Sequence, residues 1–106
     1  GAVCARHDFL EVVMKLDTLF SPMKIGSCEI PNRLVVPAMV TNYCNLEGTI
    51  TERYLRYMEE ARGGWGLLIT EDYCVQENRK GYTRIPGLWN DGQIEGNKDL
   101  TAAVHA

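Results

Sequence analysis

Two short apolar segments with a helical pattern between them constrain the fold of this chain most. Residues 34–36 (Leu-Val-Val) are followed by Pro37, and residues 67–69 (Leu-Leu-Ile) begin 33 positions after residue 34. Apolar runs of this kind, bounded by turn residues, are typical of strands that a parallel sheet buries on both faces. Their spacing is close to that of a βαβ unit, which takes about 30 residues or more. The sequence therefore predicts an α/β fold.

The segment between these runs has the pattern of an amphipathic helix. Residues 49–52 (Thr-Ile-Thr-Glu) match a capping box, with Thr49 as the N-cap and Glu52 three residues later. Gly63 and Gly64 are a natural helix stop. The residues that recur at helical spacing and predict the buried face are Tyr54, Leu55, Met58 and Ala61.

Further elements are expected on either side of the βαβ unit. Residues 23–25 and 28–30 alternate apolar and polar side chains around Gly26-Ser27, which predicts a tight hairpin that ends at Pro31. After residue 72 a long loop runs to about Asn90, which is a second N-cap candidate. The predicted apolar face of the helix that follows consists of Ile94, Leu100, Ala103 and Val104.

Composition excludes several classes of function. The net charge of −3 provides no basic surface, so nucleic acid is not an expected partner. No apolar run is long enough to span a membrane, and we expect no membrane partner. The cysteines are widely and irregularly spaced, which predicts no metal site and, without a secretory signal, reduced thiols and a cytoplasmic location. These cysteines are Cys4, Cys28, Cys44 and Cys74.

The length of 106 residues would suit one ordinary domain, but the predicted elements do not complete one. One or two helices cannot cover both faces of a parallel strand pair. We therefore expect residues 14–106 to be the opening part of a larger α/β domain. Residues 1–13 show no clear element and are interpreted as an N-terminal extension of doubtful status.

Four short strings in order resemble the Old Yellow Enzyme family of NADH:flavin oxidoreductases. Residues 19–26 resemble the opening hairpin of that family, and residues 31–36 resemble its entry into the first barrel strand. Residues 63–71 (GGWGLLITE) resemble its second strand, and residues 87–96 resemble the start of its second helix. The resemblance covers roughly residues 16–105, and the 2,4-dienoyl-CoA reductase or enoate reductase type is nearest.

The resemblance implies a (β/α)₈ TIM barrel, a fold that typically takes about 250 residues. The chain would then be an incomplete barrel: the bottom hairpin, the first two strands and the helices that follow them. It also implies FMN as cofactor, NADH or NADPH as reductant, and an activated alkene or enoyl thioester as the small-molecule substrate. The catalytic acid and the substrate-binding His/Asn pair of the family would lie downstream, so no catalytic residue is expected in this chain.

The flavin-binding residues that the resemblance implies follow the two strands, where barrels carry their active sites. The segment Pro37, Ala38, Met39, Val40 and Thr41 would lie beside the flavin ring. The hydroxyl or thiol that often tunes the flavin in this family falls on Val40, which has no donor, unless a one-residue shift lets Thr41 make that bond. Asp72 stands where a small residue approaches the flavin, and its charge would lower the flavin potential unless the side chain points into the loop.

Several other residues have a simpler structural interpretation. Glu71 is expected to be an internal carboxylate paired with a basic group, with Arg33 as a possible partner. Trp65 and Trp89 are expected to pack, and His7 and His105 are expected to be solvated. Because Gly63-Gly64-Trp65-Gly66 precedes a strand, it predicts a turn and not a phosphate-binding loop.

Two functions from different classes remain open at this point. The first is an FMN-dependent oxidoreductase, of which this chain would supply one wall of the flavin pocket. The second is a non-catalytic partial barrel that self-associates through exposed strand edges or misfolds.

Overall fold

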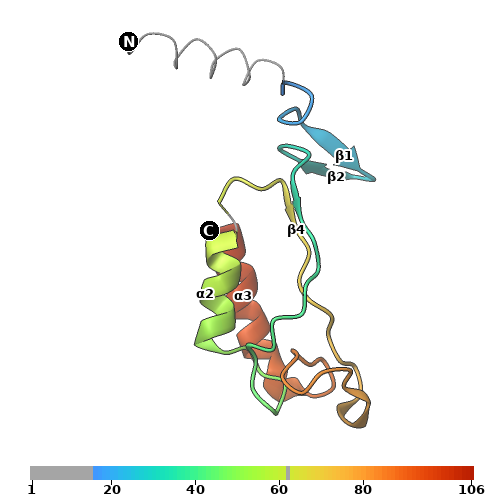
Figure 1. Ribbon diagram of the computed structural model, residues 1–106, viewed down its shortest axis with the longest axis vertical. Coiled ribbons are helices and arrows are strands. Elements are labelled where there is room, and N and C mark those ends of the chain that lie inside the picture. The colour runs from blue at the N-terminus through green and yellow to red at the C-terminus, as the bar shows by residue number, and fades with distance from the viewer. Residues whose placement is uncertain (1–15, 62) are drawn as a thin grey trace, which may run out of the picture. The chain divides into compact units, whose positions relative to one another are not determined.

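The computed structural model describes residues 16–61 and 63–106, which form two compact units (Figure 1). The first unit contains the chain up to residue 35 together with residues 65–67, and the second contains residues 36–64 and 68–106. The predicted N-terminal extension, residues 1–13, lies outside the described residues, as does His7.

The predicted hairpin is present in the first unit. Strands β1 (Met23–Ile25) and β2 (Cys28–Ile30) are antiparallel, and Met23 lies opposite Ile30. Gly26 has a φ of +60°, the left-handed conformation that a two-residue turn requires and that glycine adopts at low cost. The prediction that Pro31 ends the second arm is confirmed.

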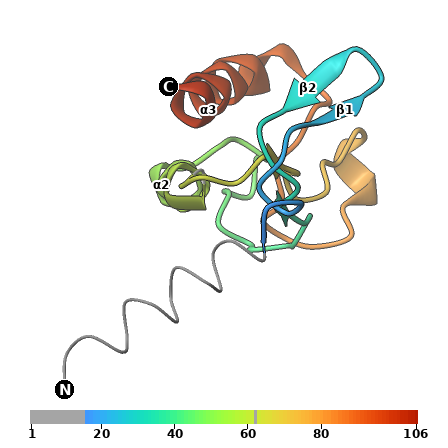
Figure 2. The same cartoon turned by 90° about the horizontal axis from the view of Figure 1, so that it is seen from above.

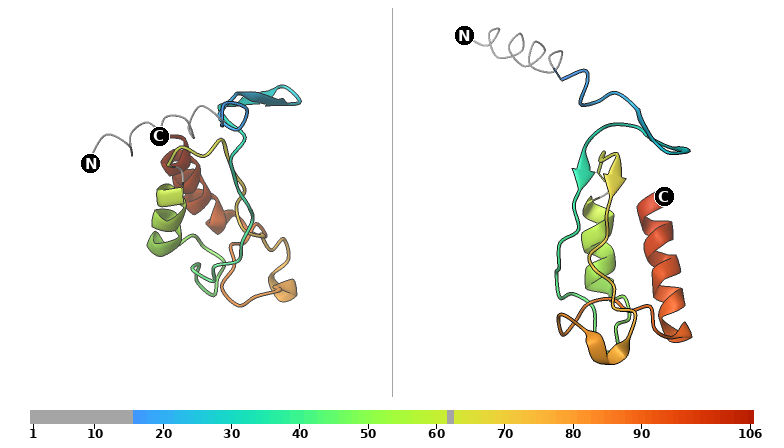
Figure 3. Two further views of the ribbon diagram at one scale, coloured as in Figure 1. Left: turned by 45° about the horizontal axis from the view of Figure 1, so that its top comes forward. Right: turned by 90° about the vertical axis from the view of Figure 1, so that its right-hand side faces the viewer.

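The two predicted inner strands are also present and pair with each other (Figure 3). They are β3 (Val35–Val36) and β4 (Leu67–Leu68). The amide of Leu67 donates to the Leu34 carbonyl and that of Ile69 to the Val36 carbonyl, at 3.3 and 2.9 Å. The pair is parallel, because the bonded residue numbers rise along both strands, from 34 to 36 and from 67 to 69.

Among the described residues the two strands are only partly buried, as expected for a parallel pair that one or two helices cannot cover on both faces. Val35 is 38% exposed and Ile69 is 46% exposed. Leu68, whose side chain alternates with that of Ile69 along the strand, packs against the core of the second unit. One face of β4 is therefore covered by helices of this chain, and the other has no covering layer among the described residues.

The glycine-rich turn before β4 is shaped by a close backbone approach in the first unit. A Cβ atom on Gly66 would lie 2.2 Å from the Asn32 carbonyl oxygen, a distance that no side chain tolerates. Gly64 has a φ of +93°. The interpretation of this segment as a turn is confirmed, whereas Trp65 is 43% exposed and does not serve there as a core residue.

Helix α2 (Glu52–Ala61) begins two residues later than predicted. Thr51 caps it, because its Oγ1 accepts a hydrogen bond of 3.2 Å from the amide of Tyr54. The Thr49 hydroxyl instead accepts a hydrogen bond from the side-chain amide of Asn45. The backbone amide of Thr49 donates to Asn45 Oδ1 at 2.9 Å. The predicted cap at Thr49 is therefore wrong, because Asn45 competes for that hydroxyl. The helix ends at Ala61, next to the predicted glycine stop.

The second helical region begins after Asn90, as predicted. The 3-10 turn η2 (Asp91–Gln93) leads directly into α3 (Ile94–His105), which lies beside α2 (Figures 1 and 2). Ile94 is 44% exposed, so its assignment to the buried face is wrong. The core between these helices and the loop before α2 is formed by Cys44, Tyr54, Met58 and Leu100.

The long loop before α3 is more ordered in its contacts than the sequence suggested. It contains the 3-10 turn η1 (Glu77–Arg79) and a parallel bridge between Cys74 and Gly87. Gln93 is 1% exposed, accepts hydrogen bonds from the amides of Trp89 and Asn90, and donates to the Glu47 carbonyl. This buried amide ties the end of the loop to the start of α3, and the packing role predicted for Trp89 is confirmed.

Candidate functional site

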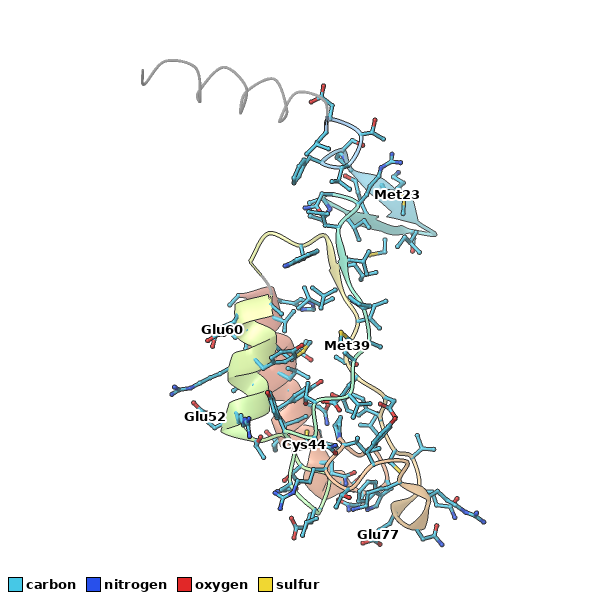
Figure 4. All side chains as sticks on the ribbon, in the orientation of Figure 1. Met23, Met39, Cys44, Glu52, Glu60 and Glu77 are labelled. Carbon is cyan, nitrogen blue, oxygen red and sulfur yellow. The ribbon has the colours of Figure 1, made fainter. Side chains whose placement is uncertain are left out.

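The residues that follow β3 leave the sheet as an exposed segment with free backbone groups. Pro37, Ala38, Met39 and Val40 are all exposed, and Met39 reaches 64% (Figure 4). No described residue forms a hydrogen bond with the amides of Ala38, Met39 or Val40. These backbone donors are therefore free to bind a ligand.

The next residue, Thr41, is held firmly by Glu71. The hydroxyl of Thr41 donates to Glu71 Oε1 at 2.7 Å, and its amide donates to Oε2 at 3.3 Å. The same hydroxyl accepts a hydrogen bond of 3.2 Å from the amide of Tyr43. Thr41 follows β3 and Glu71 follows β4, so this pair of hydrogen bonds, called here the Thr41–Glu71 clamp, joins the loops at the carboxyl ends of both strands.

Glu71 is buried without a cationic partner among the described residues of its own unit. Glu71 is only 3% exposed, and both of its carboxylate oxygens accept hydrogen bonds from Thr41. The expectation of an internal carboxylate is confirmed, and within its unit the donors to this carboxylate are an amide and a hydroxyl. Pairing with a basic group such as Arg33, which lies in the other unit, stays a prediction.

Three further titratable groups interact electrostatically with this carboxylate. Burial raises the pKa of the Cys44 thiol to about 12, with a further rise from Glu71 and a partial offset from the Thr51 backbone. Burial also raises the pKa of Tyr73 to about 12, and Cys44 and Glu71 add to it. The pKa of Tyr54 is raised by burial, then by Tyr73 and Glu71. All three groups are consequently neutral at physiological pH.

The two tyrosines of this cluster differ in their hydrogen bonding. Tyr73 Oη donates to Asn97 Oδ1 at 2.8 Å, and the side-chain Nδ2 of Asn97 donates to the Gln93 backbone carbonyl. Tyr54 is fully buried, and its hydroxyl makes no hydrogen bond of normal geometry to any described residue. Tyr54 is therefore a packing residue with an unpartnered hydroxyl beside the Glu71 backbone.

The structure brings some of the expected site residues together and leaves others apart. Thr41 is joined to Glu71, whereas Asp72 is exposed and forms no hydrogen bond with a described residue. Residues Cys44, Tyr54 and Tyr73 were not identified from the sequence. The only sequence signal for them is the position of Tyr54 on the apolar face of its helix, since their approach to Glu71 depends on long-range packing.

Other kinds of site find no support among residues 16–61 and 63–106. No group of three metal-ligating side chains lies together in this part of the chain. Neither described helix is long and apolar enough to cross a bilayer.

Comparison with known proteins assigns the chain to a family. The model of the NADH:flavin oxidoreductase / NADH oxidase family matches residues 18–106. This chain belongs to that family. The match spans every described element, from the hairpin to α3, and confirms the resemblance that the four sequence strings indicated.

Individual members of this family match in both sequence and structure. NADH oxidase of Thermoanaerobacter brockii is 38% identical over 93 residues, which is 83% of this chain and 14% of that protein. The Old Yellow Enzyme of Trypanosoma cruzi is 30% identical with a TM-score of 0.77, over 86% of this chain and 24% of that one. A 2-naphthoyl-CoA reductase, solved with 2-naphthoyl-CoA, is 32% identical with a TM-score of 0.77, over 84% and 14%.

These matches also define how much of a family member this chain represents. It spans a quarter or less of the length of each of these three relatives. At 30 and 32% identity, the structural likeness assigns the chain an α/β fold like that of the corresponding part of Old Yellow Enzymes.

Proposed function

We propose that this chain forms part of an FMN-dependent oxidoreductase that takes its reducing equivalents from NADH or NADPH. The family match over residues 18–106 is the observation that carries the proposal. The activity is proposed for a whole family member, because this chain spans a quarter or less of the length of its relatives. The role proposed for this chain is to form one wall of the flavin pocket.

The residues present fit a flavin in the chemistry of their donors. Ala38, Met39 and Val40 are exposed, and their amides make no hydrogen bond with a described residue, so these amides can donate to the polar edge of a flavin ring. Met39 offers an apolar, polarizable side chain beside them. When bound, FMN supplies hydride transfer from the nicotinamide to the substrate. The contribution of this chain is to bind and orient that cofactor.

Thr41 and Val40 have different proposed roles in this pocket. Val40 stands at the position where the family often places a hydroxyl or thiol, and it has no donor. The Thr41 hydroxyl already donates its hydrogen bond to Glu71 Oε1 at 2.7 Å. We therefore propose that no side-chain hydroxyl of this segment tunes the flavin and that its contacts come from the backbone.

Asp72 is proposed to act on the flavin through its charge. It is exposed and forms no hydrogen bond with a described residue, so no neighbouring group in this part of the chain neutralises it. A carboxylate near the flavin disfavours the reduced, anionic form and lowers the potential. The direction of this effect does not require direct contact.

The proposed architecture is the first quarter of an eight-stranded α/β barrel. The parallel pair β3 and β4, each followed by a helix, is the repeating unit of such a barrel. Ile69 and Met39 are exposed apolar residues that a complete barrel would cover. We propose a small activated alkene or enoyl thioester as the substrate of the complete protein.

The proposal is tested by purifying the complete gene product that contains this chain in the presence of FMN. We expect a yellow complex with one FMN per chain, bleached by NADH or NADPH under anaerobic conditions and reoxidised by an activated alkene. A flavin-free product, or a flavin that neither nicotinamide reduces, would contradict the proposal. A cytoplasmic location is part of it, supported by the buried thiols of Cys44 and Cys74.

A second candidate is association through exposed apolar side chains. Met39, Ile69 and Val75 are 64, 46 and 75% exposed, and exposed apolar side chains favour association. Sedimentation of the purified chain across a range of concentrations tests this candidate. A concentration-dependent mass without flavin binding would favour it, whereas a monomer that binds FMN would favour the oxidoreductase.

A further inference from the structure

The Thr41–Glu71 clamp lies at one end of the segment proposed to contact the flavin. Pro37 has no N–H, and the amides of residues 38–40 make no hydrogen bond with a described residue, so the conformation of this segment depends on how its two ends are held. At the first end, the Val36 carbonyl accepts the Ile69 amide at 2.9 Å. At the second end, Thr41 is bound to Glu71.

Both ends are therefore attached to the same neighbouring strand and its exit loop. The anchor points Ile69 and Glu71 are two residues apart on that segment, while four residues of the first loop run between them. A segment tied at both ends loses little conformational entropy when a ligand binds its free amides. If both bonds to Glu71 were removed, the second end would keep only the hydrogen bond from the Tyr43 amide to the Thr41 hydroxyl.

Stability alone does not readily explain why a glutamate is buried at position 71. A buried carboxylate with no cation pays a desolvation cost that hydrogen bonds only partly offset. Here the carboxylate accepts two hydrogen bonds from a single residue, Thr41. Its geometry thus serves to fix Thr41 and the backbone that precedes it.

We propose that Glu71 is a positioning residue for the flavin: through Thr41 it pre-organises the backbone amides of residues 38–40. This inference rests on the proposed function and adds a residue that does not itself touch the cofactor. It also assigns the Thr41 hydroxyl to the clamp, so that Thr41 acts on the flavin only through the backbone.

The test is a double-mutant cycle on FMN affinity in the complete gene product. Glu71→Gln leaves the clamp one acceptor oxygen instead of two, and Thr41→Val removes its hydroxyl donor while the Thr41 amide remains. Each variant weakens the clamp and is expected to weaken FMN binding by about ten-fold. The double variant is expected to bind no more weakly than the weaker single variant, because both changes remove the same interaction. Thr41→Ser keeps the hydroxyl and is expected to restore most of the affinity.

The rate of amide hydrogen exchange provides a second measurement of the clamp, and it needs no flavin. In the flavin-free protein, the Thr41 amide is expected to exchange about ten-fold faster in Glu71→Gln than in the unmodified protein. Glu77→Gln is the matched control, because Glu77 is an exposed glutamate on η1, remote from the clamp, and its removal is expected to leave both measurements unchanged.

The outcomes separate this inference from the proposed function. An unmodified protein that takes up no FMN would overturn both. An unmodified protein that binds FMN, together with additive losses in the cycle or an unchanged affinity in Glu71→Gln, would overturn the positioning role alone. A lower melting temperature in Glu71→Gln with unchanged FMN affinity would assign Glu71 to stability only.

Discussion

Thr41 Oγ1 lies 2.7 Å from Glu71 Oε1, and this hydrogen bond joins residues that are 30 positions apart in the sequence. It connects the loops that follow two adjacent parallel strands. In α/β barrels these loops carry the functional residues. Loss of the clamp is therefore expected to affect both the stability of the fold and the conformation of these loops.

Thr41→Val is expected to lower the free energy of unfolding by about 1–3 kcal/mol, because it leaves a buried carboxylate oxygen without its hydroxyl donor. Valine keeps the shape of threonine, so the loss reports the hydrogen bond and not a cavity. Urea denaturation measures the change. Thr41→Ser is the control and should retain most of the stability; equal losses in the two variants would contradict the assignment.

Gly87→Ala is expected to destabilise the second unit by about 1–3 kcal/mol through overpacking. The added Cβ would lie 2.2 Å from Trp89 Cζ3 and 2.5 Å from Gln93 Nε2. Gly81→Ala is the matched control on the same loop, since a Cβ there meets nothing within 4 Å. Thermal unfolding of the two variants should differ clearly, and similar curves would argue against the tight packing around Trp89.

Tyr54→Phe and Tyr73→Phe are expected to have opposite effects on stability. Tyr54 has a buried hydroxyl without a hydrogen bond of normal geometry, so its removal should leave the unfolding free energy unchanged or raise it by about 1 kcal/mol. Tyr73 donates to Asn97 at 2.8 Å, and its removal should cost about 0.5–1.5 kcal/mol. Chemical denaturation of the pair tests the prediction, and the reverse order of stability would refute it.

The buried acidic groups predict a loss of stability at alkaline pH. Burial raises the pKa of Cys44 from 9.0 to about 12, so the folded state keeps its proton while the unfolded state releases it. The stabilisation is complete below pH 9 and is lost as the pH rises toward 12. Each such group should lower the unfolding free energy by about 1.4 kcal/mol per pH unit in this window.

Denaturation of the protein at several pH values measures this slope, and Tyr54 and Tyr73 should steepen it above pH 10, their ordinary value. Cys44→Ala removes one titrating group and should make the slope shallower by one proton. An unfolding free energy that stays constant between pH 9 and 12 would contradict the burial of this cluster.

Thiol modification should distinguish the described cysteines by burial. Cys28 is exposed, whereas Cys44 and Cys74 are 2 and 6% exposed. Iodoacetamide under native conditions is expected to label Cys28 and to spare the other two until denaturant is added. Mass spectrometry of the digested protein reads the result, and rapid native labelling of Cys44 would show that the core between α2 and α3 is open.

Local sequence patterns were sufficient for the order of the elements. The hairpin around Gly26, the parallel strand pair and the two helices appear where turn residues and apolar periodicity predicted them. The family followed from short strings in the correct order, and the match over residues 18–106 confirms it. Each of these conclusions depends on residues that are close together along the chain.

Contacts between distant residues could not be predicted in the same way. Thr49 has the ideal spacing for a capping box, yet Thr51 caps α2 because Asn45 binds Thr49. Several hydroxyls and amides compete for each acceptor, and the folded chain decides between partners whose local preferences are nearly equal.

The candidate site shows the same division. By itself, the sequence determined the family, the α/β class and the segment after β3 where a flavin-binding wall is expected. Only the tertiary structure decided that Thr41 binds Glu71 and that Tyr54, Tyr73 and Cys44 interact electrostatically with that carboxylate. The reason is that a buried carboxylate must be satisfied by whichever donors the fold brings within reach, and folding alone sets that geometry.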